Sequence, residues 1–157
     1  MGDDADNLRL LVADEDDLAV ASALLQDAII PGVDISFNRH DRQFILIANR
    51  FCWEQPALKD ITSAGGKPVH ERRLCAVRLS HVVSVQRQNW PNDPKEALFN
   101  LLALHQPDMA ETAGTARWLQ MDFSGGASLR LTVDKLDLIV ADLDAGHPTS
   151  LYPQHDI

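Results

Sequence analysis

Apolar and polar residues alternate on both sides of a pair of glycines, and this pattern predicts a β-hairpin over residues 117–133. Residues that face each other across an antiparallel pair of strands share one side of the sheet. The apolar residues of the two strands are therefore expected to lie opposite each other: Leu119, Met121 and Phe123 on the first strand, and Leu131, Leu129 and Ala127 on the second. This register leaves a three-residue turn, Ser124 to Gly126, because a two-residue turn would bury polar residues among the apolar ones.

The opposite face of this hairpin is polar apart from Trp118. Gln120 is expected to face Arg130, and Asp122, one diagonal step away, is expected to form a surface ion pair with Arg130. Such a face leaves Trp118 as an exposed aromatic side chain.

Two segments have the apolar spacing of amphipathic helices. The first is expected to begin after Asp14, a candidate N-cap, and to end near Ile30, before a proline and a glycine. The second follows the hairpin, with Asp134 as its candidate N-cap and with Gly146 and Pro148 as its end. Its apolar residues at helical spacing are Leu136, Ile139, Val140 and Leu143.

Most of the other apolar runs predict strands, at residues 8–12, 33–38 and 43–53. The last of these is apolar on both faces, which is typical of a central strand or of a strand that changes partners. Residues 73–87 alternate as one bent strand, or as two strands joined at a bulge near Ser80.

Residues 54–70 lack periodicity and contain several breakers, so they predict a long surface loop. Asp93 and Pro94 have the form of a helix start. The residues that follow fit either a longer helix or a strand paired with 117–123, and we expect one helical turn followed by that strand.

Together these elements predict an α+β fold, a mostly antiparallel curved sheet or partly closed barrel with an N-terminal and a C-terminal helix. A chain of 157 residues favours a single domain over residues 1–157. The ends, residues 1–7 and 145–157, are expected to be loosely ordered tails.

Charge is unevenly distributed along the chain. The net charge is −9, yet residues 39–95 carry ten basic and five acidic side chains, whereas residues 1–27 carry eight acidic and one basic. The overall charge argues against binding of nucleic acid, although a local basic patch could hold an anion. The acidic N-terminus does not resemble a secretory signal and no apolar run is long enough to span a membrane, so we expect a cytoplasmic protein.

Residue types that carry chemistry are present without a recognisable motif. Cys52 and Cys75 are expected to be buried core residues. The six histidines show no metal-ligand spacing, and neither glycine-rich segment matches a phosphate-binding loop. The sequence therefore indicates no metal site, no cofactor and no catalytic residue.

One basic cluster is dense enough to suggest a ligand site. It consists of Lys67, His70, Arg72, Arg73 and Arg78. These side chains could bind a phosphate or a carboxylate. The alternative is intramolecular, because basic strands can simply neutralise the acidic helices of the same chain.

Four segments resemble a known family. They are LRLLVADEDDLAVASALLQDA at residues 8–28, NRFCWE at 49–54, LLAL at 101–104 and FSGGASLRLTV at 123–133. Their order and spacing resemble the DUF2948 family, small bacterial proteins with a domain of unknown function, over nearly the whole chain. The resemblance implies a cytoplasmic single-domain bacterial protein, and it carries over no activity and no catalytic residue.

Three classes of function remain as hypotheses. The first is a non-enzymatic interaction module that binds a protein partner or a second copy of the chain, through the sheet face around Trp118 and Arg130 or through residues 54–70. The second is a small-molecule or anion binder that uses the basic segment 67–87. The third, an enzyme, would use His81 or His105 with a nearby carboxylate, and has the least support.

Overall fold

The computed structural model describes residues 7–53, 58–62, 68–107, 117–143 and 147–149. In chain order its elements are β1 (Arg9–Val12), α1 (Glu15–Leu25), β2 (Ile29–Pro31), η2 (Gly32–Asp34), β3 (Ile35–Asn38), β4 (Gln43–Phe51), β5 (Leu58–Thr62), β6 (Pro68–Leu79), β7 (Val82–Gln88), η3 (Pro94–Glu96), β8 (Leu98–His105), β9 (Arg117–Phe123), η4 (Ser124–Gly126), β10 (Ser128–Val133), β11 (Leu138–Asp142) and β12 (His147–Thr149). The elements labelled η are single turns of 3₁₀ helix.

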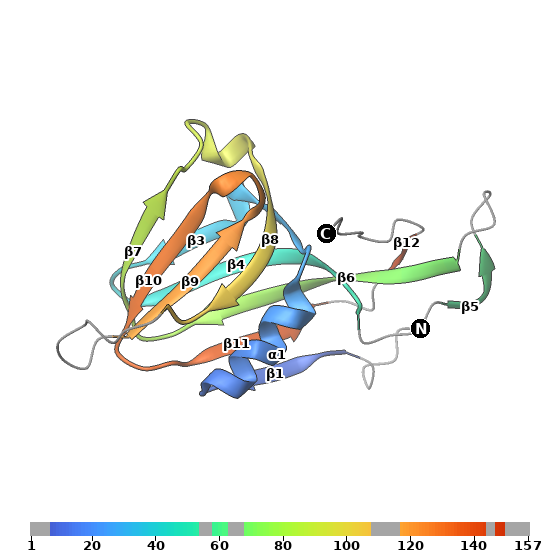
Figure 1. Cartoon of the computed structure of the whole chain (residues 1–157), viewed down its shortest axis with the longest axis horizontal. Helices are drawn as coiled ribbons and strands as arrows, with labels where there is room; N and C mark the ends of the chain where they lie inside the picture. The colour runs from blue at the N-terminus through green and yellow to red at the C-terminus, as the bar shows by residue number, and fades with distance from the viewer. Residues whose placement is uncertain (1–6, 54–57, 63–67, 108–116, 144–146, 150–157) are drawn as a thin grey trace.

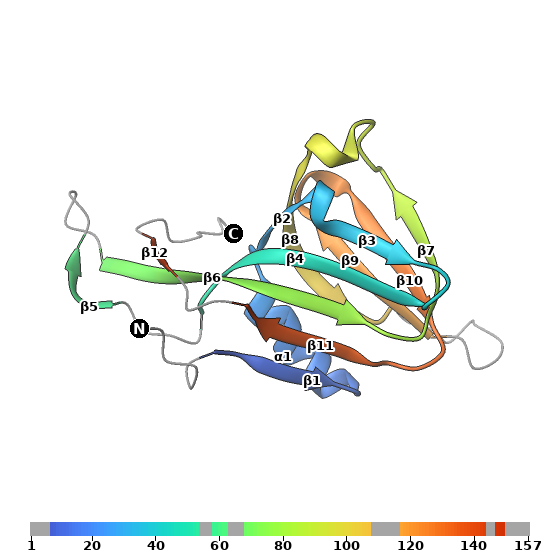
Figure 2. The same ribbon diagram turned by 180° about the vertical axis from the view of Figure 1, so that it is seen from behind.

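A mostly antiparallel sheet dominates the fold, as predicted. Its strands follow the order β1, β11, β6, β4, β2, β8, β9, β10, β7, while β3 pairs with β4, and β5 and β12 pair with β6. The sheet curls so that β3 and β7 lie across from each other, and α1 packs against β1, β4 and β8 (Figures 1 and 2). No ladder joins β3 to β7 in the described part of the chain, so the sheet is not closed into a barrel.

The predicted C-terminal helix is wrong. The segment after the hairpin forms β11, which lies between β1 and β6. Its buried residues, Leu138 and Val140, are two apart, and the β-branched Ile139 and Val140 suit a strand. Asp134 caps no helix there, and its carboxylate pairs with Arg42 on the surface. Backbone partners on both sides therefore override an apolar spacing that also fits a helix.

The N-terminal helix is confirmed, but it is shorter than predicted. Asp14 accepts a hydrogen bond from the backbone N–H of Asp17 at 2.8 Å and so caps α1 as expected. The helix ends at Leu25 instead of near Ile30, because the chain is then recruited into β2, between β4 and β8.

The hairpin has the predicted register. The N–H of Phe123 donates to the carbonyl oxygen of Ala127 at 2.9 Å, and Met121 faces Leu129. Both glycines of the turn have positive φ angles, 83° and 94°, which a residue with a side chain rarely adopts. The apolar side of both strands is buried, as the alternation predicts.

The two ambiguous segments are resolved. Residues 93–105 form one 3₁₀ turn, η3, followed by β8 paired with β9, as expected. Residues 73–87 are two strands, because the chain breaks at His81, where φ is +61°, and β7 then pairs with β10 instead of with β6.

The predicted loop at 54–70 and the predicted tails are described only in part. Residues 58–62 form β5 and β6 already begins at Pro68, while 54–57 and 63–67 lie outside the described residues. In the tails, residues 147–149 form β12, and 1–6, 145–146 and 150–157 lie outside the described residues.

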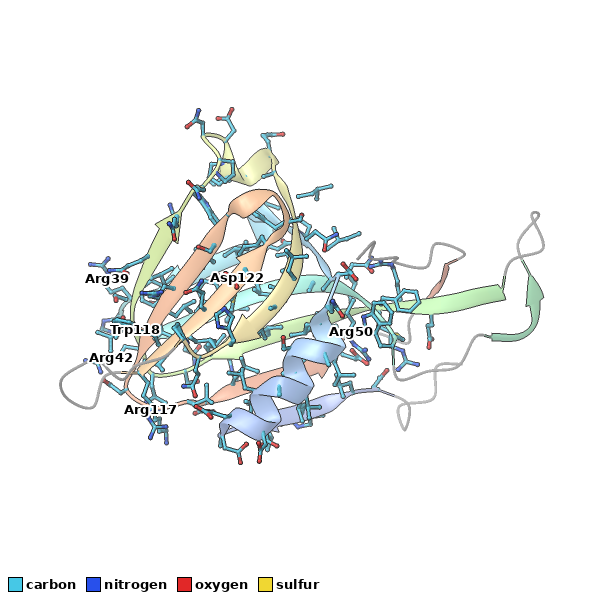
Figure 3. The ribbon with its side chains drawn as sticks, in the orientation of Figure 1. Arg39, Arg42, Arg50, Arg117, Trp118 and Asp122 are labelled. Atoms are coloured by element: carbon cyan, nitrogen blue, oxygen red, sulfur yellow. The ribbon has the colours of Figure 1, made fainter. Side chains whose placement is uncertain are left out.

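The core lies on the concave side of the sheet. It includes Phe44, Leu46, Val77, Leu79, Leu101, Met121, Leu129 and Leu131. β4 contributes buried side chains along its whole length, in agreement with the central position predicted for it. The turn that precedes β4 carries Arg39 and Arg42. Arg50 lies near the opposite end of this strand (Figure 3).

Candidate functional site

The sheet has an open seam between β3 and β7, and backbone hydrogen bonds hold both ends of this seam. At one end the N–H of Val82 donates to the carbonyl oxygen of Arg42 at 2.9 Å. At the other end the N–H of Gly32 donates to the carbonyl oxygen of Ala97 at 2.8 Å. Because the ends are joined while the strands between them are not paired, the seam opens in its middle.

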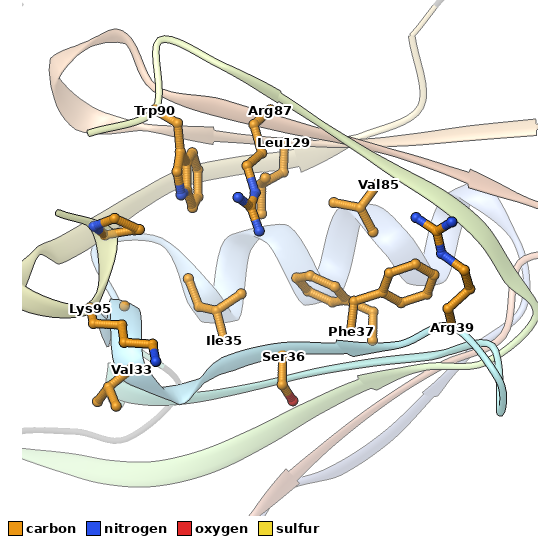
Figure 4. A pocket seen from close by; sticks show the side chains of 13 residues that line it. Val33, Ile35, Ser36, Phe37, Arg39, Val85, Arg87, Trp90, Lys95 and Leu129 are labelled. Atoms are coloured by element: carbon orange, nitrogen blue, oxygen red, sulfur yellow. The ribbon is translucent and has the colours of Figure 1, made fainter. Parts of the chain in front are cut away.

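A cavity of about 500 Å³ lies in this seam. Most of its apolar lining comes from β3, β4, β7, β10 and the loop after β7, and includes Ile35, Phe37, Phe44, Val85, Trp90 and Leu129 (Figure 4). Phe44 and Leu129 are buried and form the floor, whereas Phe37 and Trp90 are only half-buried. The pocket therefore exposes aromatic surface that the fold itself does not cover.

The Trp90 ring is held in place by other aromatic rings. It stacks on Phe99, with ring centroids 4.5 Å apart and an interplanar angle of 20°. It also meets Phe123 edge-on at 5.9 Å. Arg87 places its Cζ atom 5.9 Å from the Trp90 ring centroid, within reach of a cation–π interaction.

Three cations line the same pocket: Arg39, Arg87 and Lys95. Arg39 and Lys95 lie at opposite ends of the cavity, and Arg87 reaches in between them (Figure 4). The lining contains no aspartate or glutamate. No ion pair of these three cations occurs within the described residues. The pocket thus combines an apolar floor with an uncompensated positive charge.

The structure does not gather the described members of the predicted basic cluster into one site. Arg72 donates to the carbonyl oxygen of Asn49 at 3.1 Å and lies over the Phe51 ring, and burial lowers its pKa. Arg78 is exposed. Lys67 and the side chain of His70 lie outside the described residues.

Arg73 points to the opposite face of β6 from Arg72. It is buried and pairs with Glu71 at 3.1 Å and with Asp142 at 3.7 Å. These two carboxylates support the intramolecular alternative for Arg73, and the ligand role of the cluster stays a prediction.

The outer face of the hairpin carries a chain of polar contacts around Trp118, which is half-buried (Figure 3). Arg130 lies over the Trp118 ring at 4.6 Å and donates to Gln120 at 2.9 Å. Gln120 donates to Asp122 at 2.8 Å, and Asp122 contacts His105 at 2.7 Å. The predicted pair between Asp122 and Arg130 is therefore wrong, because Gln120 stands between them.

The candidate catalytic histidines have carboxylate neighbours but lie outside the seam pocket. His105 lies 2.7 Å from Asp122, and His81 lies 3.5 Å from Asp137, in both cases on partly exposed surface. Neither histidine lines the seam pocket.

Among the described residues, the cysteines and the metal-ligand residue types offer no further site. Cys52 and Cys75 are buried and free, as expected, and burial raises the pKa of Cys75 to about 12. No three His, Cys, Asp or Glu side chains gather into a metal site within the described ranges.

Sequence reasoning missed the seam pocket because its residues are far apart in the chain. Arg39, Arg87 and Lys95 share no motif, and Trp90 stands alone in a polar segment. The available signal was the net positive charge of residues 39–95, which contain all four residues.

No helix in the described residues is long and apolar enough to cross a membrane.

Comparison with known proteins identifies a family. No curated protein and no solved structure matches the chain. A family model described as "protein of unknown function (DUF2948)" matches residues 8–155 of the 157. The chain belongs to the DUF2948 family.

Proposed function

We propose that this protein binds a small organic molecule in the pocket between β3 and β7. The observation that carries the proposal is a cavity of about 500 Å³ with an apolar floor in a seam whose two ends are held by backbone hydrogen bonds. Small-molecule sites are typically clefts of roughly 300–1,000 Å³, lined by apolar and aromatic side chains with a few polar groups. The seam has this size and this composition.

The two sides of the pocket are held against each other by backbone contacts at both ends of the seam. Gly32 packs so closely against η3 that a Cβ atom at this position would lie 1.7 Å from the carbonyl oxygen of Pro94. Together with the two backbone hydrogen bonds, this contact sets the distance between the two sides of the seam. A preformed site loses little conformational entropy on binding, which favours affinity.

A second hollow, on the convex face, supports binding less well. It is lined by Gln86, Arg87, Gln88, Gln120, Ser128 and Arg130. This lining has no apolar residue, so a ligand there would gain little from burial of apolar surface. Arg130 is already engaged with Gln120 and Trp118.

Recognition of a protein partner, or of a second copy of the chain, stays a prediction, as does a cytoplasmic location. The Trp118 ring is partly covered by Arg130, so a partner would pack on this pair instead of on a bare ring. Residues 54–57 and 63–67 of the other predicted surface lie outside the described residues. The seam pocket has more support, because its shape and its chemistry are both described.

A thermal-shift screen against a library of charged and neutral organic molecules tests the proposal. A ligand at a hundred times its dissociation constant stabilises the fold by about 2.7 kcal/mol, which is several degrees in Tm for a chain of this size. Val85→Trp should fill the pocket and abolish the shift. Val83→Trp is the matched control, because Val83 is an exposed residue on the same strand that does not line the pocket.

Two outcomes would contradict the proposal: a screen without hits, or hits that shift Val85→Trp as much as the wild type. Should Val85→Trp fail to fold, as judged by its unliganded Tm, Ile35→Trp fills the same cavity from β3.

A further inference from the structure

We propose that the ligand of the seam pocket is an aromatic carboxylate, with its ring against Trp90 and its acid group paired with Arg87. This proposal rests on the proposed function and names the class of ligand. It follows from three properties of the pocket: its charge, the position of its aromatic wall, and its closed ends.

The charge of the pocket selects an anion. Arg39, Arg87 and Lys95 line it, its lining contains no acidic side chain, and no carboxylate among the described residues pairs with any of the three. All three cations are exposed, so an anionic group that enters the pocket meets positive charge above an apolar floor. A guanidinium suits a carboxylate well, because its N–H groups form a planar fork that donates two parallel hydrogen bonds.

The aromatic wall selects a flat apolar body. Trp90 is fixed by the stack on Phe99 and by the edge of Phe123, so little order is lost when a second ring packs on it. Arg87 lies over the Trp90 ring at 5.9 Å. A carboxylate attached to a ring at Trp90 would therefore lie near the guanidinium of Arg87. Ring contacts of this kind contribute about 0.5–1.5 kcal/mol beyond the buried area in general.

The closed ends of the seam select a short ligand. The Arg42–Val82 and Gly32–Ala97 hydrogen bonds bound the opening in both directions along the strands. A long polyanion would also be repelled by the net charge of −9. An inorganic anion would leave the floor of Phe44 and Leu129 without contact.

Arg87 is expected to hold the acid group because of its position. Arg39 and Lys95 lie at the two ends of the cavity, whereas Arg87 lies between them, beside Trp90 (Figure 4). Removal of the Arg87 charge should therefore weaken binding more than removal of the Lys95 charge.

The experiment measures the affinity of a panel of aryl carboxylates, from benzoate through naphthalene-2-carboxylate to anthracene-2-carboxylate, each paired with its neutral carboxamide. A Trp53→Phe/Trp118→Phe protein retains Trp90 as its single tryptophan, and ligand stacking should quench its fluorescence. At least one carboxylate should bind about tenfold or more tightly than its carboxamide. Arg87→Gln should remove this preference, and Arg78→Gln, which deletes the same charge from an exposed residue away from the pocket, should leave it unchanged.

Three results would overturn the aromatic carboxylate. They are carboxamides that bind as tightly as the acids, cyclohexanecarboxylate that binds as tightly as the aryl acids, and a panel without any binding. In each case the proposed function still stands if the library screen gives hits that Val85→Trp abolishes. The proposed function is wrong as well if no small molecule binds and an extended peptide does, because β3 and β7 would then be sites for strand addition.

Discussion

Arg50 and Asp142 form a bidentate ion pair that is completely buried and links β4 to β11 across β6. The Nε atom of Arg50 donates to Oδ1 of Asp142 at 2.8 Å, and Nη2 donates to Oδ2 at 2.9 Å. The backbone N–H of Leu8 donates to the same carboxylate at 2.8 Å, and Arg73 approaches it to 3.7 Å. One carboxylate therefore joins three strands and the segment that leads into β1.

Asp142→Asn should cost about 3–5 kcal/mol of unfolding free energy, because it removes the charge of a buried carboxylate that pairs with Arg50 and Arg73. Urea denaturation measures the loss. Asp134→Asn is the control, since its pair with Arg42 is about 60% exposed on the arginine side, and such pairs contribute about 0–1 kcal/mol. Similar losses in the two variants would show that burial of the Asp142 pair does not matter.

Gly32→Ala should destabilise the corner between η2 and η3. The added Cβ would lie 1.7 Å from the carbonyl oxygen of Pro94, so backbone must move, and overpacking of this kind costs typically 1–3 kcal/mol. Thermal unfolding should show a clear drop in Tm. Gly125→Asn is the comparison, because it adds a larger side chain in open space and asparagine tolerates a positive φ angle. An unchanged Tm for Gly32→Ala would contradict the close contact.

The stability of the protein should fall at high pH through Cys75. Burial raises the pKa of this thiol from its ordinary value of 9.0 to about 12. Between these two values the unfolded chain has lost the proton and the folded chain has kept it, so the free energy of unfolding decreases as the pH rises. Below pH 9 both states are protonated, and the thiol adds no pH dependence.

The measurement compares urea unfolding of the wild type and Cys75→Ala between pH 8 and pH 11. The stability of the wild type relative to the variant should decrease as the pH rises above 9. A difference between them that stays constant over this range would rule out the raised pKa.

Phe99→Leu should weaken binding of naphthalene-2-carboxylate, because it removes the ring on which Trp90 stacks. Phe51→Leu is a matched control, since Phe51 is also buried but does not line the pocket. Both variants should lose stability by roughly 1 kcal/mol or somewhat more, as expected for a smaller side chain in a core. Fluorescence titration should show reduced affinity for Phe99→Leu alone. Equal affinities in the two variants would show that the stack of Trp90 on Phe99 does not contribute to binding.

The hairpin was predictable because its determinants are local. Alternation sets the face of each residue, and the pair Phe123–Ala127 follows once the apolar sides are matched. The cap at Asp14 is local as well. Segment 136–143 was not predictable in this way, because Leu136, Val140 and Leu143 fit a helix as well as Leu136, Leu138 and Val140 fit a strand. The partners that decide between them, β1 and β6, come from distant parts of the chain.

The candidate site depends even more on long-range structure. Arg39 lies in the turn after β3, Arg87 near the end of β7 and Lys95 in η3, and only the curl of the sheet brings them to one cavity. The burial of Arg73 between two carboxylates could not be predicted from the sequence either. Its neighbours on β6, Arg72 and Leu74, lie on the opposite face of the strand and do not indicate what Arg73 contacts. Alternation predicts which residues share a face, but not which faces enclose a space.

The seam also determines how the protein behaves toward other chains. β3 and β7 each carry a backbone edge that has no partner in the described sheet, and such edges tend to recruit strands from other molecules and so to start aggregation. Here the two edges face each other across a narrow opening bordered by Arg39, Arg87 and Lys95. A neighbouring molecule would have to bring a strand past three positive charges to reach either edge. The seam therefore opposes edge-to-edge pairing through β3 and β7.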